Sequence, residues 1–244
     1  MRRPWPAATA RSTPDTPRLE VAPDLFTQRG DRIRLLGIPF DTQGVVIRMP
    51  NGGLWLHSPV RPTKAGIDEI SNLGPIAHII APNRIHGAFT SDWAAIAPEA
   101  TVWVSPKFSV RHPDIDFDHT LDDTAPEAWA DILDQCHFRG SIYLDEMVFL
   151  HRPSGTLIVT DILQSHDPNR EPWMWRQVKR LAGILAPDVA TPPDLKRTFR
   201  DRERARAARD RILSWEFDRI LMPHAVPVMQ DGKATFARAM AWLD

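Results

Sequence analysis

Three residues of metal-ligand type each follow an apolar run that predicts a β-strand: His86, Asp161 and His224. In open α/β sheets the loops at strand ends gather in one place, so these side chains are candidates for a single site. Two histidines and one carboxylate form a ligand set that suits Zn(II), Fe(II) or Mn(II). We therefore expect one divalent metal ion, of one of these three kinds, held by these residues.

Each of the three residues also has an ordinary structural interpretation. A histidine after a strand is more often a hydrogen-bonding loop residue than a ligand. Asp161 could cap the segment that follows it, and His224 could be a turn residue. The combination of two histidines and one acid at three strand ends carries more weight than any one member.

A second acid is expected beside Asp161. The turn at 152–155 pairs Leu150 with Leu157 in the simplest hairpin, and in that register Glu146 lies opposite Asp161. Two facing carboxylates repel unless a proton or a cation lies between them. Glu146 is therefore a candidate fourth ligand or general acid–base group, with a solvent-facing edge position as the alternative. A shift of one residue in register would place Asp145 opposite Asp161 in place of Glu146.

Three further side chains are expected to contact a small-molecule substrate in the same cleft. His57 and Ser58 end an apolar strand, and Asn83 lies in the turn that precedes the first candidate ligand. His151 is not expected to reach the site, because it lies in the hairpin turn at the far end of its strand.

Strands and helices alternate along the chain. Short apolar segments predict strands at 33–38, 44–49, 54–57, 76–81, 101–105, 141–150, 156–163 and 217–222, with hairpin turns at 50–53 and 152–155. Helical spacing predicts helices at 63–73, 89–96, 173–185, 196–214 and 232–243. Residues 106–137 are interpreted as a long loop with a short helix near Trp129. This alternation is typical of an α/β fold.

Composition excludes several functional classes. The net charge of −1 gives no general attraction to nucleic acid or to an anionic membrane, and the mixed charges of 197–211 predict a solvated helix face. The one cysteine, Cys136, excludes an internal disulfide and a thiolate-rich zinc site. No apolar run reaches the ~18 residues that a membrane helix needs, and we expect a soluble, cytoplasmic protein.

Domain organisation follows from the same composition. Residues 1–23 are rich in Pro, Arg, Thr and Ala and predict a flexible N-terminal arm. With 43% hydrophobic residues, the remainder can bury a sizeable core, and 24–244 are expected to form a single domain. Residues 165–193, which contain several Trp and Pro residues, are expected to form a lid or edge of the cleft.

Three segments carry a resemblance to a known family: Gly52–Pro59, Ile79–His86 and Phe149–Asp161. They resemble an uncharacterised bacterial family of unknown function, which is similar to a divergent branch of the metallo-β-lactamase superfamily. The resemblance extends from about Leu25 to the C-terminus. It implies an αβ/βα sandwich of two mixed β-sheets flanked by helices.

The resemblance also implies a reduced metal site. The superfamily's metal loop reads His-x-His-x-Asp-His, and it aligns with four residues of which only the last is a histidine: Ala81, Asn83, Ile85 and His86. Asp161 matches the bridging aspartate and His224 the final histidine, whereas the intermediate histidine has no match within 141–146. One of two metal positions is therefore implied, with Glu146 in place of the lost acid.

Three functional hypotheses follow. The first is a metal-dependent, hydrolase-like enzyme with a mononuclear site, in which Glu146 and Asp161 take catalytic roles. The second is a catalytically degenerate fold that binds a small molecule or a protein. The third is a mononuclear iron or manganese oxidoreductase that uses the same two histidines and one aspartate. The first is the leading hypothesis, and the second is close behind it.

Overall fold

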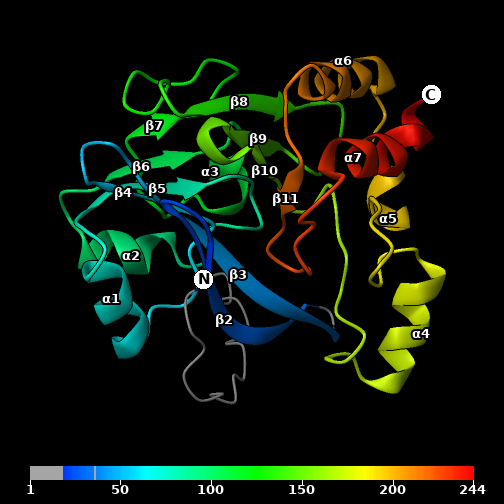
Figure 1. The fold of residues 1–244 in the computed structure, drawn as a ribbon, viewed down its shortest axis with the longest axis horizontal. Helices are drawn as coiled ribbons and strands as arrows, with labels where there is room; N and C mark the ends of the chain where they lie inside the picture. The colour runs from blue at the N-terminus through cyan, green and yellow to red at the C-terminus, as the bar shows by residue number, and fades with distance from the viewer. Residues whose placement is uncertain (1–18, 36) are drawn as a thin grey trace.

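Two β-sheets pack face to face in the computed structural model, which describes residues 19–35 and 37–244 (Figure 1). The first sheet follows the order of the chain, with antiparallel pairing up to β4 and parallel pairing beyond it. Its strands are β1 (Leu19–Ala22), β2 (Leu25–Leu35), β3 (Ile38–Arg48), β4 (Leu54–His57), β5 (Ile76–Ala81), β6 (Thr101–Val104) and β7 (His119–Thr120).

The second sheet has the strand order β11-β10-β9-β8. Strand β9 is antiparallel to both neighbours, and β10 is parallel to β11. The bounds are β8 (Leu133–Phe138), β9 (Glu146–His151), β10 (Thr156–Ile158) and β11 (Arg219–Leu221). Each sheet is thus mixed, as the resemblance implied.

Helices cover the outer face of each sheet, and Figure 1 shows them on opposite sides of the molecule. Side chains of α1 and α2 pack on the first sheet, and those of α6 and α7 pack on the second. The helices are α1 (Lys64–Ser71), α2 (Thr90–Ile96), α3 (Phe108–Arg111), α4 (Trp173–Leu181), α5 (Pro193–Lys196), α6 (Arg202–Leu213) and α7 (Gly232–Met240), with short 3₁₀ turns at Arg152–Ser154 and Ala241–Leu243. The architecture is an αβ/βα sandwich.

The alternation of side chains along the central strands builds three core layers. Trp55 and Phe149 point between the sheets, whereas Leu54 and Leu56 point to the helices on one side and Val148 to those on the other. All five side chains are buried. Because successive residues of a strand face opposite sides, a strand that is apolar throughout requires a partner layer on both faces.

The predicted elements with sharp turn or cap signals are confirmed. Strands β4 and β5 have the predicted bounds, and the turn between β3 and β4 has Gly52 at φ 84°. Helix α1 begins after Thr63, whose side chain accepts a hydrogen bond from the Gly66 N–H at 3.1 Å. Such a cap satisfies one of the free amides of the first helical turn.

Several predictions were wrong in their bounds; for example, the helix expected at 196–214 is divided into α5 and α6, and the strand expected at 141–150 begins only at Glu146. Residues 19–22 of the expected N-terminal arm form β1, whereas the earlier part of that arm lies outside the described residues. The expected strand at 33–38 spans instead the end of β2 and the start of β3, which form one long hairpin with Gly37 at φ 83°. The loop expected at 106–137 contains most of β8. This strand is buried although its sequence includes the polar residues Gln135 and His137.

None of the helices among the described residues is both long and apolar enough to span a membrane. The longest of these helices is α6, which has 12 residues and carries alternating charges. The mixed charges of this helix agree with the solvated face that the sequence predicted.

The packing of the layer between the sheets can be tested by a substitution at Phe149. This residue is 0% exposed, and its ring lies 4.9 Å from that of Trp55 in an edge contact. We expect Phe149→Ala to lower the free energy of unfolding by about 3–5 kcal/mol, because a large cavity would remain. The measurement is urea unfolding followed by tryptophan fluorescence.

Val110→Ala provides the control, since Val110 is 72% exposed on α3. Its effect on the free energy of unfolding should stay within about 0.5 kcal/mol. Equal losses in the two variants would contradict the proposed packing between the sheets.

Candidate metal centre

The three predicted ligands come together at the carboxyl ends of strands from both sheets. His86 follows β5, Asp161 follows β10 and His224 follows β11. His86 Nε2 lies 3.3 Å from Asp161 Oδ2 and 3.1 Å from His224 Nε2, and His224 Nε2 lies 3.9 Å from Asp161 Oδ1. Among the described residues these three form the one cluster whose ligand atoms all lie within 4.8 Å of one another.

A backbone carbonyl fixes the orientation of His224. Its Nδ1 donates to the carbonyl oxygen of Asp41 at 2.5 Å, so the proton of the neutral ring resides there and Nε2 offers a lone pair to the cluster. Burial, and then the nearby His86, lower the pKa of His224 to about 4. The ring is therefore neutral at pH 7, which is the form that binds metal ions.

His86 is held by a hydroxyl group. Its Nδ1 shares a hydrogen bond of 2.7 Å with Ser58 Oγ, which leaves Nε2 directed at Asp161. Burial opposes the charged ring, but the carboxylates of Asp161 and Glu146 outweigh it, so the pKa of His86 lies above its ordinary value. Without a cation, a proton on His86 compensates the buried carboxylate.

Asn83 connects Asp161 to the loop that carries His86. Its amide nitrogen donates to Asp161 Oδ2 at 2.8 Å and to Thr160 Oγ1 at 2.8 Å. Its amide oxygen accepts the N–H groups of Ile85 and His86 at 2.7 and 2.9 Å. Burial raises the pKa of Asp161, but His86, His224 and Asn83 together hold it at about 2.

The donor set fits a divalent cation. Two imidazole nitrogens and a carboxylate oxygen face one another at 3.1 to 3.9 Å, and both histidines use their second nitrogen elsewhere. Partners of this type orient metal-ligating histidines in proteins. Imidazole and carboxylate together suit Zn(II), Fe(II) and Mn(II).

Glu146 has a different role from the one predicted. The register between β9 and β10 pairs Leu150 with Leu157, as expected, and Glu146 does lie beside Asp161. Its two oxygens, however, accept the N–H groups of Thr160, Asp161 and Ile162 at 2.6, 2.7 and 3.1 Å. Both oxygens of this fully buried carboxylate are therefore turned to the backbone, and Glu146 does not line the cavity.

Burial and the neighbouring Asp161 raise the pKa of Glu146 to about 7. The general acid–base role expected from the sequence requires contact with substrate, which this position does not provide. The structure assigns Glu146 to holding the backbone turn that carries Asp161.

A cavity of about 540 Å³ opens over the three candidate ligands. Ser58 lines it, as predicted for a substrate-contacting residue. Asn83 and His57 do not: the first is fully buried behind Asp161, and the second lies between the sheets, with its ring stacked on Trp55 at 5.4 Å. The structure therefore does not place these two side chains on the cavity wall, because the Asn83 amide is engaged by Asp161 and Thr160 and His57 packs in the core.

The segment expected to form a lid does edge the cavity. Trp175, Val178, Lys179 and Ala182 line it from α4 and the residue that ends this helix, and Pro192 lines it from the approach to α5. These α4 positions are three or four residues apart, so they share one helix face.

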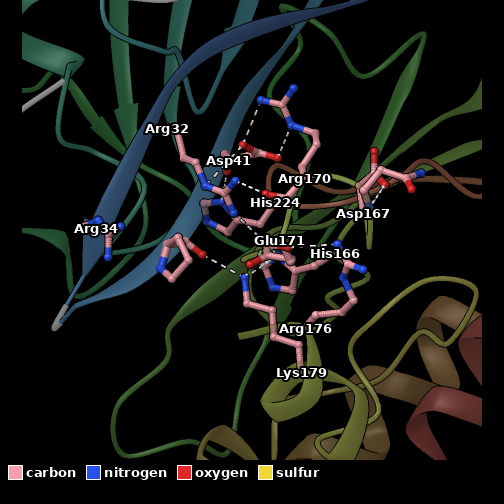
Figure 2. A network of polar contacts seen from close by, with 12 residues as sticks. Arg32, Arg34, Asp41, His166, Asp167, Arg170, Glu171, Arg176, Lys179 and His224 are labelled. Atoms are coloured by element: carbon pink, nitrogen blue, oxygen red, sulfur yellow. Dashed lines mark hydrogen bonds and ion pairs between the residues drawn. The ribbon is translucent and has the colours of Figure 1, made fainter. Parts of the chain in front are cut away.

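A charged network ties this lid to β3, and sequence reasoning missed it (Figure 2). Arg170 donates to both carboxylate oxygens of Asp41 at 2.6 and 3.0 Å. Lys179 donates to the Pro39 carbonyl at 2.8 Å and to Glu171 at 2.8 Å. Asp41 is the residue whose carbonyl orients His224, so the lid also braces a candidate ligand. The one signal of this arrangement in the sequence is the helical spacing of Trp175, Val178–Lys179 and Ala182, which places these residues on one helix face.

Several solved structures have the same fold. A metallo-β-lactamase from Pontibacter korlensis is 11% identical, with a TM-score of 0.62 over 93% of this chain and 98% of that one. A metallo-β-lactamase from Erythrobacter litoralis is 11% identical, with a TM-score of 0.61 over 97% and 95%. A metal-soaked flavodiiron core from a Synechocystis species is 13% identical, with a TM-score of 0.61 over 94% of this chain and 61% of that one. The fold is that of the metallo-β-lactamase superfamily.

The chain belongs to the family described as "Domain of unknown function (DUF4336)", whose model matches residues 33–181. No curated protein sequence shows significant similarity to it. The resemblance inferred from the sequence is thus confirmed for both the family and the superfamily fold.

His57 generates a prediction about acid stability. Burial, and then His86, lower the pKa of His57 to about 3, and neither ring nitrogen has a hydrogen-bond partner. Between about pH 6.5 and pH 3 the unfolded chain takes up a proton at His57 that the folded chain does not. Stability is therefore lost as the pH falls through this window, by up to about 1.4 kcal/mol per pH unit for one such group.

We expect His57→Phe to reduce the loss of unfolding free energy between about pH 7 and pH 5 by about 1–2 kcal/mol, because a phenyl ring takes up no proton in the unfolded chain. Urea unfolding at both pH values measures the difference. Parallel losses in the variant and the parent protein would show that His57 is solvated or paired.

Proposed function

We propose that this protein is a metal-dependent hydrolase with a mononuclear site formed by His86, Asp161 and His224, acting on a small molecule. The observation that carries the proposal is the convergence of their ligand atoms at the floor of the cavity. Three protein ligands with one side open to a cavity are the arrangement found in catalytic zinc sites, whereas structural sites are closed by a fourth. The similarity to metallo-β-lactamases supports the fold only.

The roles of the residues follow from their contacts. His86, Asp161 and His224 would hold the cation, and such a cation lowers the pKa of a bound water and polarises a carbonyl or phosphoryl oxygen. Ser58 and the Asp41 carbonyl fix the two imidazole rings. Fixing the rings before the cation binds reduces the cost of assembling the site.

The neighbouring positions support one cation rather than two. Ala81 and Ile85 carry no donor atoms, and both polar atoms of Asn83 are already engaged. Among the described residues there is no second cluster of three histidine, cysteine or acidic ligands. A mononuclear site is therefore the proposal that these side chains can satisfy.

The first test of the proposal is metal stoichiometry. Protein purified without added metal and then titrated with Zn(II), Fe(II) or Mn(II) should bind about one ion per chain. His224→Ala should weaken binding by more than about 100-fold, which exceeds the usual cost of losing an outer-shell partner. Mass spectrometry of the bound metal and calorimetry give both quantities.

His151→Ala is the matched control, because His151 is also a buried histidine but bonds only to Ser154 within its hairpin. It should bind metal like the parent protein. Failure of the parent protein to bind any of the three ions would refute the proposal. The hypothesis of a catalytically degenerate fold that binds a small molecule or a protein would then remain. Preferential retention of iron would favour the oxidoreductase hypothesis over hydrolysis.

A second test concerns Asn83, which holds Asp161 without facing the cavity. We expect Asn83→Ala to weaken metal binding by about 10–100-fold, because one carboxylate oxygen loses its donor and the loop of His86 loses its brace. Asn169→Ala, at an exposed position, should leave the affinity unchanged. Calorimetric titration compares the two variants, and equal affinities would remove Asn83 from the site.

A further inference from the structure

Apolar side chains form most of the wall above the candidate ligands. They come from the β2–β3 hairpin, from the segment after β4 and from α4, and include Ile33, Ile38, Phe40, Val60, Trp175 and Val178. A volume of about 540 Å³ falls within the usual range for small-molecule pockets. A bound molecule would therefore rest against hydrocarbon and aromatic surface once its reacting group lies at the floor.

Lys179 is the only lysine or arginine among the described residues that line this cavity, and its charge is already compensated. Its side chain is 3% exposed. Its Nζ donates to Glu171 Oε1 at 2.8 Å, to the Pro39 carbonyl at 2.8 Å and to His166 Nδ1 at 3.1 Å. An ammonium group has three donors, so none remains for a ligand (Figure 2).

The partners of Lys179 are themselves fixed. Glu171 also accepts from Arg32 Nη2 at 2.8 Å, and His166 Nε2 shares a hydrogen bond with Gln164 at 3.1 Å. The exposed surface of Glu171 is 4% and that of His166 is 1%. Turning Lys179 towards a ligand would break a buried ion pair and leave Arg32 as the one remaining cation of Glu171, which is unfavourable.

The other charged groups of the cavity supply no free cation, because a proton on His86 is compensated by Asp161. Asp161 belongs to the candidate ligand set, and Asp194 is exposed at the edge formed by α5. A substrate with a second negative charge, away from its reacting group, would therefore meet no free cation and would be desolvated against an apolar wall. Such burial of an unpaired charge is strongly unfavourable.

We propose that the substrate is an uncharged, largely apolar molecule with a single hydrolysable polar group, such as a carboxylic ester with an aliphatic or aromatic chain. The proposal rests on the hydrolase function proposed above and specifies its substrate class. The apolar wall binds the chain, and the polar floor receives the ester. Phosphorylated compounds and dicarboxylates are excluded as preferred substrates by the same wall.

Two matched probes test the charge preference. Methyl hexanoate and monomethyl adipate share the ester and the chain length, but the second carries a carboxylate at the far end. We expect the full-length protein, both with and without zinc, to bind methyl hexanoate at least tenfold more tightly in calorimetric titrations. With zinc bound, kcat/KM for 4-nitrophenyl hexanoate should exceed that for mono-4-nitrophenyl adipate by at least tenfold.

Two neighbouring substitutions test the location. Ala182→Trp would place an indole ring in the cavity, whereas Leu181→Trp changes a residue that is 90% exposed. The first should weaken methyl hexanoate binding at least tenfold, and the second should leave it unchanged. Zinc affinity should be the same in both variants, because neither Leu181 nor Ala182 belongs to the candidate metal-ligand set.

The two proposals fail in different ways. Equal or tighter binding of monomethyl adipate, or ester binding that Ala182→Trp leaves unaffected, would overturn the substrate class even if zinc binds. Absence of binding of zinc, iron and manganese alike, with methyl hexanoate still bound in the cavity, would refute the hydrolase and keep the apolar binding site. Circular dichroism and urea unfolding of Ala182→Trp establish that a loss of binding is not a loss of fold.

Discussion

The carboxylate of Asp161 is a buried negative charge at the junction of the two sheets, and the surrounding side chains are arranged to stabilise it. Asn83 donates to it from the loop after β5, and the Nε2 atoms of His86 and His224 lie 3.3 and 3.9 Å from its oxygens. An isolated ion in such a place would cost several kcal/mol, which folding could not supply without these partners. The same partners leave two imidazole nitrogens directed at one point, so the compensation of one charge also produces the candidate metal centre.

A second buried carboxylate, that of Glu146, stands next to the first, and the two are kept in different states. The histidines and Asn83 hold the pKa of Asp161 at about 2, whereas burial and the charge of Asp161 raise that of Glu146 to about 7. Glu146 compensates part of this cost by accepting three backbone amides from the turn that carries Asp161. Its contribution is therefore to the shape of that turn, and its position beside the ligand set is a consequence of sheet register.

Sequence patterns predicted those parts of the fold that depend on local chemistry. The caps, turns and apolar runs around β4, β5 and α1 have strong local signals, and their bounds were right. Strand β8 was missed because its buried residues include Gln135 and His137, whose polar groups are satisfied by partners outside the strand. The three candidate ligands were found because they end strands, but the direction of His57 and Asn83 depends on which face of a loop packs inward. The carbonyl that orients His224 leaves no trace in the sequence, since every residue has one.

Residues Pro39–Asp41 of β3 join the candidate metal centre to the wall of the cavity. The Asp41 carbonyl orients His224, the Asp41 carboxylate binds Arg170, and the Pro39 carbonyl accepts from Lys179 of α4. Phe40, between them, packs its ring edge-on against both His166 and His224. A change in the position of α4 therefore acts on the same short strand segment that fixes a ligand. Because three successive residues carry these contacts, the apolar wall and the polar floor are parts of one rigid unit, which is the arrangement that a precisely positioned catalytic site requires.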